Sequence, residues 1–249
     1  WTLSSAAFST PSYIKCFTYI KHAIYINLEH RTDRNEHVIN QLTTLGLPTF
    51  ERFNAIKMEH GAIGCSMSHL NILQNALKNN WDHILILEDD ITFLNPELFK
   101  KNFNTFLQRQ GNNWDVILFA GNNIPPYDKV DEVSIKVKQC LTTTGYLVNG
   151  HYLKKLIANV KMGITHLLNK PDKGILYAID KFWFVLQGLD RWYLIIPPTI
   201  IQREDYSDIE KRKTNYQKMM TDIDKTEFLK ANIQRQKQLQ SQAKLNFFN

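Results

Sequence analysis

Three adjacent carboxylates, Glu88-Asp89-Asp90, directly follow the apolar run at residues 83–87 (HILIL). Because like charges this close repel one another, the cluster costs stability unless a cation or hydrogen-bond donors neutralise it. A hard divalent cation takes oxygen ligands from such a cluster, with diphosphate oxygens at its other positions. Side chains alternate along an extended chain, so we expect Glu88 and Asp90 to point one way and Asp89 the other. The alternative is that Asp89 and Asp90 cap the next helix or turn.

A second polar segment, residues 27–34 (NLEHRTDR), also follows an apolar run. Arg31 and Arg34 stand three residues apart at the start of a predicted helix. Guanidinium groups and backbone N–H groups can bind an anion at such a position. The alternative is a solvated helix face on which Asp33 is the cap.

A third segment, residues 61–69 (GAIGCSMSH), places two glycines before and within a predicted helix. Gly64 permits close approach of the backbone to a ligand, and Ser68 and His69 bring polar groups to an otherwise apolar helix. The alternative is that Ser68 and His69 are satisfied core residues and that Cys65 only fills space. Cys65 and His69 are four residues apart, but no partner Cys or His completes a zinc site.

These polar segments need a scaffold that brings them together. Hydrophobic patterning predicts strands at 22–28, 49–55, 83–87 and 115–120, and helices at 31–45, 63–78 and 96–108. Gly46 is the expected residue just after the first of these helices. This alternation predicts an α/β fold with a mostly parallel central sheet. Ligands bind at the carboxyl edge of such sheets, so the segments that follow the strands should converge on one cleft.

The second half of the chain has a less regular pattern. We expect an edge strand at 133–139, a strand at 142–148, a short helix at 152–160, small helices within 175–186, a strand at 192–201 interrupted by Pro197-Pro198, and a helical tail at 211–249. In the tail, Tyr216, Met219, Met220 and Ile223 form a stripe that should pack on the domain.

The composition is that of an ordinary globular protein. Of its 249 residues, 43% are hydrophobic and 22% charged, which excludes bulk disorder and collagen-like repeats. No apolar run approaches the roughly 20 residues of a membrane span, and no signal peptide is visible. We therefore expect a cytoplasmic or host-cytosol location, although the start at Trp1 leaves a removed leader open. Three cysteines, Cys16, Cys65 and Cys140, favour a reducing compartment and free thiols.

The net charge of +6 suits an anionic ligand. A nucleic-acid-binding protein is one alternative, but the tail has only a modest basic excess and no accompanying aromatic-basic motif, so no nucleic-acid partner is expected.

Four segments, taken in order, resemble glycosyltransferase family 25, which includes lipooligosaccharide and collagen β-galactosyltransferases. They are residues 24–28 with Arg31, Asp33 and Arg34; residues 52–55; Gly64-Cys65 with Ser68-His69; and residues 85–90. The resemblance covers roughly residues 22–210. It implies a GT-A-type fold, a nucleotide-sugar donor that is usually UDP-linked, Mn²⁺ or another divalent cation, and transfer with inversion at the anomeric carbon.

The resemblance also implies roles for individual residues. Those expected at the nucleotide sugar are Asn27, Leu28, Arg31, Arg34, Asn54, Ala55, Ser68, His69, Glu88, Asp89, Arg203 and Ser207. Asp90 is the expected chief metal ligand, with Glu88 beside it and the amide of Gln202 as a weaker oxygen ligand. One departure is Ile56-Lys57, where many members of the family have an acidic residue after the Ala.

Inverting transfer needs a base for the acceptor hydroxyl, and Asp180 is our candidate. It precedes Phe182, Trp183 and Phe184, which would desolvate the carboxylate and stack on sugar rings. The alternative is that Asp180 caps a helix and the aromatics belong to the core.

The sequence therefore predicts a metal-dependent hexosyltransferase that moves galactose or glucose from a UDP-sugar to a hydroxyl of a glycan or a hydroxylysine-containing protein. The alternative is a catalytically silent, glycan-binding relative. We expect an N-terminal lead at 1–21, a GT-A domain at 22–210 and a helical extension at 211–249, the last being a candidate contact for a homo-oligomer.

Overall fold

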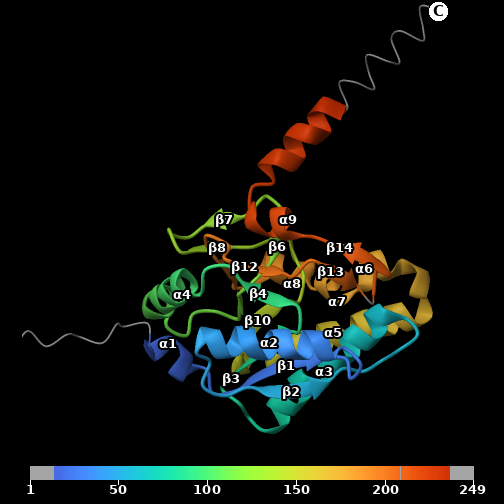
Figure 1. Ribbon diagram of the computed structural model, residues 1–249, viewed down its shortest axis with the longest axis horizontal. Coiled ribbons are helices and arrows are strands. Elements are labelled where there is room, and N and C mark those ends of the chain that lie inside the picture. Colours follow the sequence, from blue (N-terminus) through green and yellow to red (C-terminus); the bar gives the residue numbers. More distant parts are fainter. Residues whose placement is uncertain (1–13, 208, 236–249) are drawn as a thin grey trace, which may run out of the picture.

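The computed structural model describes residues 14–207 and 209–235, with the side chains of Ile14, Lys15, Cys16 and Ile175 left out. An eight-stranded sheet forms its centre, in the order β2-β1-β3-β10-β5-β11-β8-β7 (Figure 1). The strands are β1 (Ala23–Asn27), β2 (Glu51–Asn54), β3 (His83–Glu88), β5 (Val116–Leu118), β7 (Asp128–Lys129), β8 (Ser134–Lys136), β10 (Gly145–Asn149) and β11 (Trp192–Ile195).

Most strands of this sheet run in one direction. The strands β1, β2 and β3 pair in parallel, as do β5 and β11. Only β10 and β8 run the other way, because β10 pairs antiparallel with both β3 and β5, and β8 with both β11 and β7. The predicted α/β fold with a mostly parallel sheet is therefore confirmed. Strand β8, which the sequence predicts at the edge of the sheet, is the second strand from that edge, because β7 pairs with its outer side.

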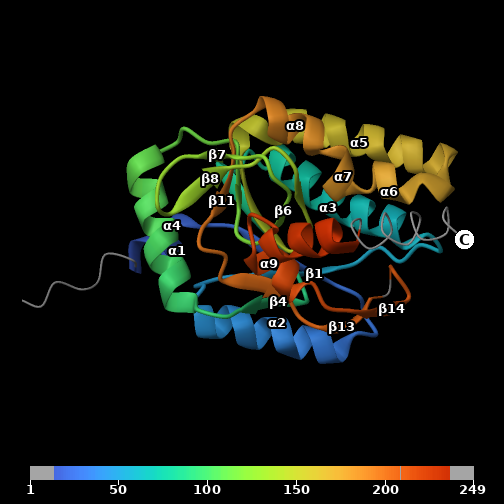
Figure 2. The same ribbon diagram turned by 90° about the horizontal axis from the view of Figure 1, so that it is seen from above.

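Helices cover both faces of the sheet. Helices α3 (Gly61–Lys78) and α5 (Leu153–Asn169) lie on one face, and α2 (Thr32–Leu45) and α4 (Pro96–Gln110) on the other (Figure 2). Alternate strand residues enter the two cores: Ile24 and Ile86 pack on the α3/α5 side, whereas Tyr25 and Leu87 pack on the α2/α4 side. Gly46, with φ of 80°, ends α2 as the sequence predicts.

Short elements complete the chain. The helix α1 (Ile14–Tyr19) precedes the sheet, and α6 (Gly174–Tyr177), α7 (Ile179–Phe182) and α8 (Phe184–Leu189) connect α5 to β11. The remaining strands form three two-stranded sheets, β4 (Ile91–Phe93) with β12 (Ile200–Gln202), β6 (Asn122–Asn123) with β9 (Cys140–Leu141), and β13 (Asp205–Ser207) with β14 (Arg212–Thr214).

The tail differs in part from the expected helix. Strand β14 pairs with β13 across the expected boundary at residue 210, so residues 212–214 are not helical. Helix α9 (Gln217–Thr221) buries Met220 in the core on the α2/α4 side, and Tyr216 packs against that core. Ile223 packs against the core on the α3/α5 side. Residues 226–235 form a helix that projects from the domain (Figure 1). Residues 236–249 and the first thirteen residues of the expected lead lie outside the described residues.

No helix among the described residues is both long enough and apolar enough to cross a membrane.

Candidate functional site

A cavity of about 840 Å³ opens at the carboxyl ends of β1, β2 and β3. This volume lies within the range of small-molecule sites. The predicted site residues that line it are Leu28, Arg34, Ala55, Ser68, His69, Glu88, Asp89, Asp90, Asp180, Gln202 and Ser207. The polar segments after the strands thus meet at one cavity. Asn27, Arg31, Asn54 and Arg203 are not part of the lining.

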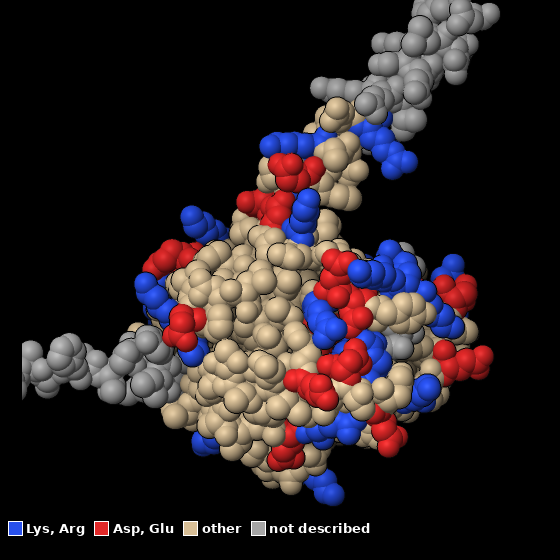
Figure 3. Space-filling model, in the orientation of Figure 1, with Lys and Arg blue, Asp and Glu red and all other residues tan. Residues whose placement is uncertain are grey.

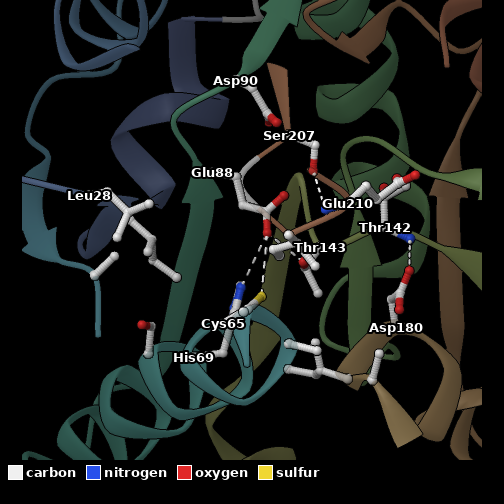
Figure 4. A pocket seen from close by; sticks show the side chains of 18 of the residues that line it. Leu28, Cys65, His69, Glu88, Asp90, Thr142, Thr143, Asp180, Ser207 and Glu210 are labelled. Carbon is white, nitrogen blue, oxygen red and sulfur yellow. Dashed lines mark hydrogen bonds and ion pairs between the residues drawn. The ribbon is translucent and has the colours of Figure 1, made fainter. Parts of the chain in front are cut away.

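The three carboxylates have different surroundings. Glu88, the last residue of β3, accepts a hydrogen bond of 2.6 Å from the Thr143 hydroxyl (Figure 4). Asp89 and Asp90 lie in the turn that follows, so strict alternation along a strand no longer applies. Asp89 is buried and accepts hydrogen bonds from Asn27 at 2.7 Å and from Arg34 at 3.1 Å.

Asp90 is the least satisfied of the three. Its buried Oδ1 has no hydrogen-bond partner among the described residues, and its Oδ2 lies 3.5 Å from Arg34. Burial and the neighbouring charge of Glu88 raise the pKa of Asp90 well above its usual range. Burial also acts to raise the pKa of Glu88, but His69 and Thr143 outweigh it and hold that pKa below its ordinary value.

This carboxylate pair fits a hard divalent cation. The orphaned oxygen of Asp90 needs a positive partner, and Glu88 and Gln202 present further oxygens to the same cavity. Gln202 pairs with Ile91, the residue after Asp90, through the short sheet of β12 and β4. The backbone N–H of Arg203 donates to the carbonyl of Asp90 at 2.7 Å, which holds this strand against the acidic turn.

The two arginines of the second segment bind carboxylates of the protein itself. Arg31 lies 2.7 Å from Asp205 and 3.0 Å from Asp33. Arg34 contacts Asp89, Asp90 and, at 3.2 Å, Asp205. Their positive charge is therefore largely matched, and only Arg34 reaches the cavity lining. A role for Arg31 at a nucleotide stays a prediction.

Charged side chains of both signs are interspersed over the β13–β14 hairpin, on the face that Figure 3 shows. Arg203, which precedes β13 in the chain, lies 3.8 Å from Asp205. On this face the net charge of +6 does not form a uniformly basic surface.

The first turns of α3 fix the loop after β2. Ser68 accepts a hydrogen bond from the backbone N–H of Ile56 and donates one to the carbonyl of Gly64, both at 2.8 Å. Ala55 donates its N–H to the carbonyl of Asn27 at 2.9 Å and faces the cavity, whereas Asn54 is exposed outside the lining. Ser68 thus shapes the cavity wall through the loop.

Asp180 lies in the first turn of α7, at the edge of the cavity away from Leu28 in Figure 4. Its carboxylate accepts a 3.1 Å hydrogen bond from the backbone N–H of Thr142. Thr142 has φ of 74°, a left-handed conformation that a β-branched residue rarely adopts. Burial raises the pKa of Asp180, and the Thr142 N–H opposes this only in part. A raised pKa in a cavity is a property that catalytic bases share, and the role of Asp180 as a base stays a prediction.

The aromatic residues after Asp180 do not form a sugar platform. Trp183 is fully buried, donates to the Cys140 carbonyl at 3.2 Å and packs against Tyr146 and Trp192. Phe182 and Phe184 are also outside the cavity lining. The expectation of stacking on sugar rings was wrong, because Trp183 lies in the core on the α3/α5 side and Phe184 packs against that core.

Several lining residues were not foreseen from the sequence. They are Cys65, Thr142, Thr143, Lys57, Lys181, Lys211, Glu210 and Tyr216. Cys65 lies beside Glu88, with 4.0 Å between its Sγ and the carboxylate, so it does more than fill space. Ser207 accepts a hydrogen bond from the N–H of Glu210 at 3.1 Å, which places both at the turn of the β13–β14 hairpin.

A family model and two curated relatives name the same family. The family described as glycosyltransferase family 25 (LPS biosynthesis protein) matches residues 57–182, just over half of the chain. A glycosyltransferase 25 family member of Anopheles gambiae is 28% identical over 171 residues, which are 55% of this chain and 28% of the mosquito protein. Procollagen galactosyltransferase 1-B of Xenopus laevis is 25% identical over 193 residues, 63% of this chain and 29% of the relative. The chain thus spans less than a third of the length of these relatives.

Solved structures show only distant similarity. The mannose-1-phosphate geranyltransferase of Thermus thermophilus has a TM-score of 0.42 and 11% identity, over 70% of this chain and 73% of the other. A glycosyltransferase involved in glycosylation of the major capsid of PBCV-1 has a TM-score of 0.37 and 11% identity, over 70% and 91%. Similarity at this level does not bear on function. The family match over residues 57–182 is the finding that bears on function, and it shows that this chain belongs to glycosyltransferase family 25.

Proposed function

We propose that this protein is a metal-dependent, inverting glycosyltransferase. It moves galactose or glucose from a UDP-sugar to a hydroxyl of a glycan or of a hydroxylysine-containing protein. The observation that carries the proposal is the largely buried carboxylate pair of Glu88 and Asp90, with an oxygen on Asp90 that has no hydrogen-bond partner among the described residues, in the same cavity as Asp180. Membership of the family supports the reaction class, and the name of the Xenopus relative supports galactose as the first donor to test.

The carboxylates give the cavity a place for the donor diphosphate. Asp90, Glu88 and Gln202 would hold a divalent cation such as Mn²⁺, which supplies neutralising charge to the leaving diphosphate. Three lysines add positive charge to the cavity lining, namely Lys57, Lys181 and Lys211. Arg31 does not supply this charge, because it is paired with Asp33 and Asp205.

Asp180 is the proposed base. It takes the proton of the acceptor hydroxyl, the freed oxygen attacks the anomeric carbon, and the bond to the diphosphate breaks with its electron pair leaving on UDP. Attack on the face opposite the leaving group inverts the configuration. The Thr142 N–H orients the carboxylate, and burial keeps its basicity higher than that of an exposed aspartate.

The test is release of UDP from a panel of UDP-sugars with Mn²⁺, with and without acceptor. Asp180→Asn should lower transfer by about 10²–10⁴-fold, while UDP affinity stays nearly unchanged. Asp172→Asn is the matched control, because Asp172 is an exposed acid only eight positions earlier in the chain. Equal activity in Asp180→Asn would remove this residue from the mechanism.

A second measurement tests the donor site itself. UDP and Mn²⁺ together should raise the melting temperature more than either alone, because each completes the other's binding site. No shift with any nucleoside diphosphate would count against the transferase. Binding of UDP without hydrolysis or transfer of any sugar would instead favour a silent, glycan-binding relative.

A further inference from the structure

Three different metal-ligating side chains meet at one wall of the cavity. Cys65 and His69 lie one turn apart on α3, and Glu88 ends β3 (Figure 4). The Glu88 Oε1 lies 4.0 Å from the Cys65 Sγ and 3.6 Å from the His69 Nε2. All three ligand atoms lie within 4.8 Å of one another. Helical spacing and the packing of α3 on β3 together produce this cluster.

The imidazole of His69 directs its Nε2 toward the Glu88 carboxylate, 3.6 Å away, without a hydrogen bond. His69 is fully buried, and its Nδ1 is hydrogen-bonded to the Tyr146 hydroxyl at 2.8 Å. Its Nε2 is buried and has no hydrogen-bond partner among the described residues. A buried polar atom without a partner is costly. Metal-binding histidines commonly hold their other ring nitrogen in this way, which fixes the direction of the ligating one.

The ligand set decides which cation would fit. Thiolate, imidazole and carboxylate are the ligands of Zn²⁺, whereas Mg²⁺ and Mn²⁺ prefer oxygen. Zinc bonds of 2.0–2.3 Å in a tetrahedron separate ligand atoms by about 3.5 Å, so the present spacing needs to close by only about 1 Å. All three residues line the cavity, which leaves the fourth position open to it.

We propose that Cys65, His69 and Glu88 form a binding site for a borderline divalent cation such as Zn²⁺. The site is distinct from the oxygen site of Asp90 and Gln202, but it shares Glu88 with it. The Cys65 thiol gives up its proton to solvent when the cation binds. When this cation binds, it withdraws Glu88 from the donor site and inhibits sugar transfer. The inhibition rests on the proposed function, but the binding of the cation is independent of it.

The first experiment titrates the purified protein with Co²⁺ in the absence of nucleotide. One equivalent should produce a near-ultraviolet thiolate-to-cobalt charge-transfer band, and Zn²⁺ should displace it. Cys65→Ser should abolish the band and weaken Zn²⁺ binding at least about 10-fold. Cys140→Ala should leave the band intact, because Cys140 is a buried thiol outside the cavity lining.

A measurement on the unmodified protein guards against a variant that fails to fold. Zn²⁺ should protect Cys65 from alkylation by iodoacetamide, read by mass spectrometry of the peptide that contains it. Absence of the cobalt band from the unmodified protein would overturn the site, as would a band that survives Cys65→Ser. Unchanged alkylation in Zn²⁺ would also overturn it and leave the cluster as an ordinary contact of His69 with Glu88.

The inhibition is tested separately. Micromolar Zn²⁺ should lower Mn²⁺-dependent UDP release at least about 10-fold in the unmodified protein, and the fractional loss should be much smaller in Cys65→Ser. Equal fractional inhibition of both would overturn the inhibitory role. A protein that shows the cobalt band but turns over no UDP-sugar would contradict the proposed function and not the cation site.

Discussion

Arg34 and Asp205 join two parts of the fold that are far apart in the sequence. The Arg34 Nε lies 3.2 Å from the Asp205 carboxylate on β13, while its Nη1 lies 3.1 Å from Asp89 in the turn after β3. Both side chains of the Arg34–Asp205 pair are largely buried, with 12% and 19% of their areas exposed. One guanidinium therefore ties the β13–β14 hairpin to the acidic wall of the cavity.

Replacing Asp205 with Asn should destabilise the protein by about 2 kcal/mol at pH 7, because it leaves largely buried charges on Arg34 and Arg31. Burial acts to raise the pKa of Asp205, but the Tyr206 N–H and Arg34 outweigh it, so the folded pKa is lowered. The stabilisation is thus complete above the ordinary carboxyl pKa of about 4 and is lost as the pH falls through the folded value.

Urea denaturation at pH 7, 5 and 3 measures this difference. The difference in free energy of unfolding between the unmodified protein and Asp205→Asn should be the same at pH 7 and pH 5 and smaller at pH 3. Asp33→Asn is the control, because Asp33 also pairs with Arg31 but is half exposed. It should cost less than about 1 kcal/mol. A larger loss for Asp33→Asn than for Asp205→Asn would contradict the anchoring role of Asp205.

The scaffold of the site could be predicted from the sequence because its signals are local. Buried strands and amphipathic helices have their own periodicities, and Gly46 marks a helix end. The reversed direction of β10 could not be read in this way. Its residues are uniformly buried, and its direction depends on the connections around it.

Residues of the cavity lining could be predicted where a local motif marks them, but their contacts with one another could not. The acidic run of Glu88 and Asp90 is visible at once, but the proximity of Cys65 to Glu88 depends on how α3 packs on the sheet. Likewise, nothing near Arg31 indicates that Asp205, 174 positions later, binds its guanidinium. Contacts of this kind are set by tertiary packing.

Thr142 holds a strained backbone conformation next to Asp180. Thr142→Gly should raise stability by about 1 kcal/mol, because glycine adopts a positive φ without the steric cost of a β-branched side chain. Transfer should be retained, since the backbone N–H that binds Asp180 remains. Thermal unfolding should show an increase of about 2–4 °C. Thr142→Ala, which removes the hydroxyl but keeps a Cβ, should gain less; an equal gain would show that backbone strain is not the cause.

Asp90 should destabilise the protein when no cation is bound. Asp90→Asn removes a largely buried carboxylate whose Oδ1 has no hydrogen-bond partner among the described residues, so the metal-free variant should be more stable by about 1 kcal/mol. Mn²⁺ at 100 times its Kd should stabilise the unmodified protein by about 2.7 kcal/mol and the variant by far less. Differential scanning calorimetry with and without EDTA measures both effects. An undiminished response of the variant to Mn²⁺ would exclude Asp90 as a ligand.

Gly64 allows α3 to begin directly against the loop after β2. A Cβ at this position would overlap the backbone carbonyl of Ile56 and lie 3.2 Å from the backbone N of Met58. Because backbone atoms cannot rotate away, Gly64→Ala should displace residues 55–58, which line the cavity. We expect a loss of about 2–4 kcal/mol in the free energy of unfolding and a higher KM for the donor.

Gly188→Ala is the matched control for Gly64→Ala. Gly188 lies in α8, where an added Cβ would meet no atom within 4 Å, so this variant should gain up to about 1 kcal/mol of stability. Similar stability and KM in both variants would show that the loop tolerates the methyl group and that Gly64 does not shape the cavity.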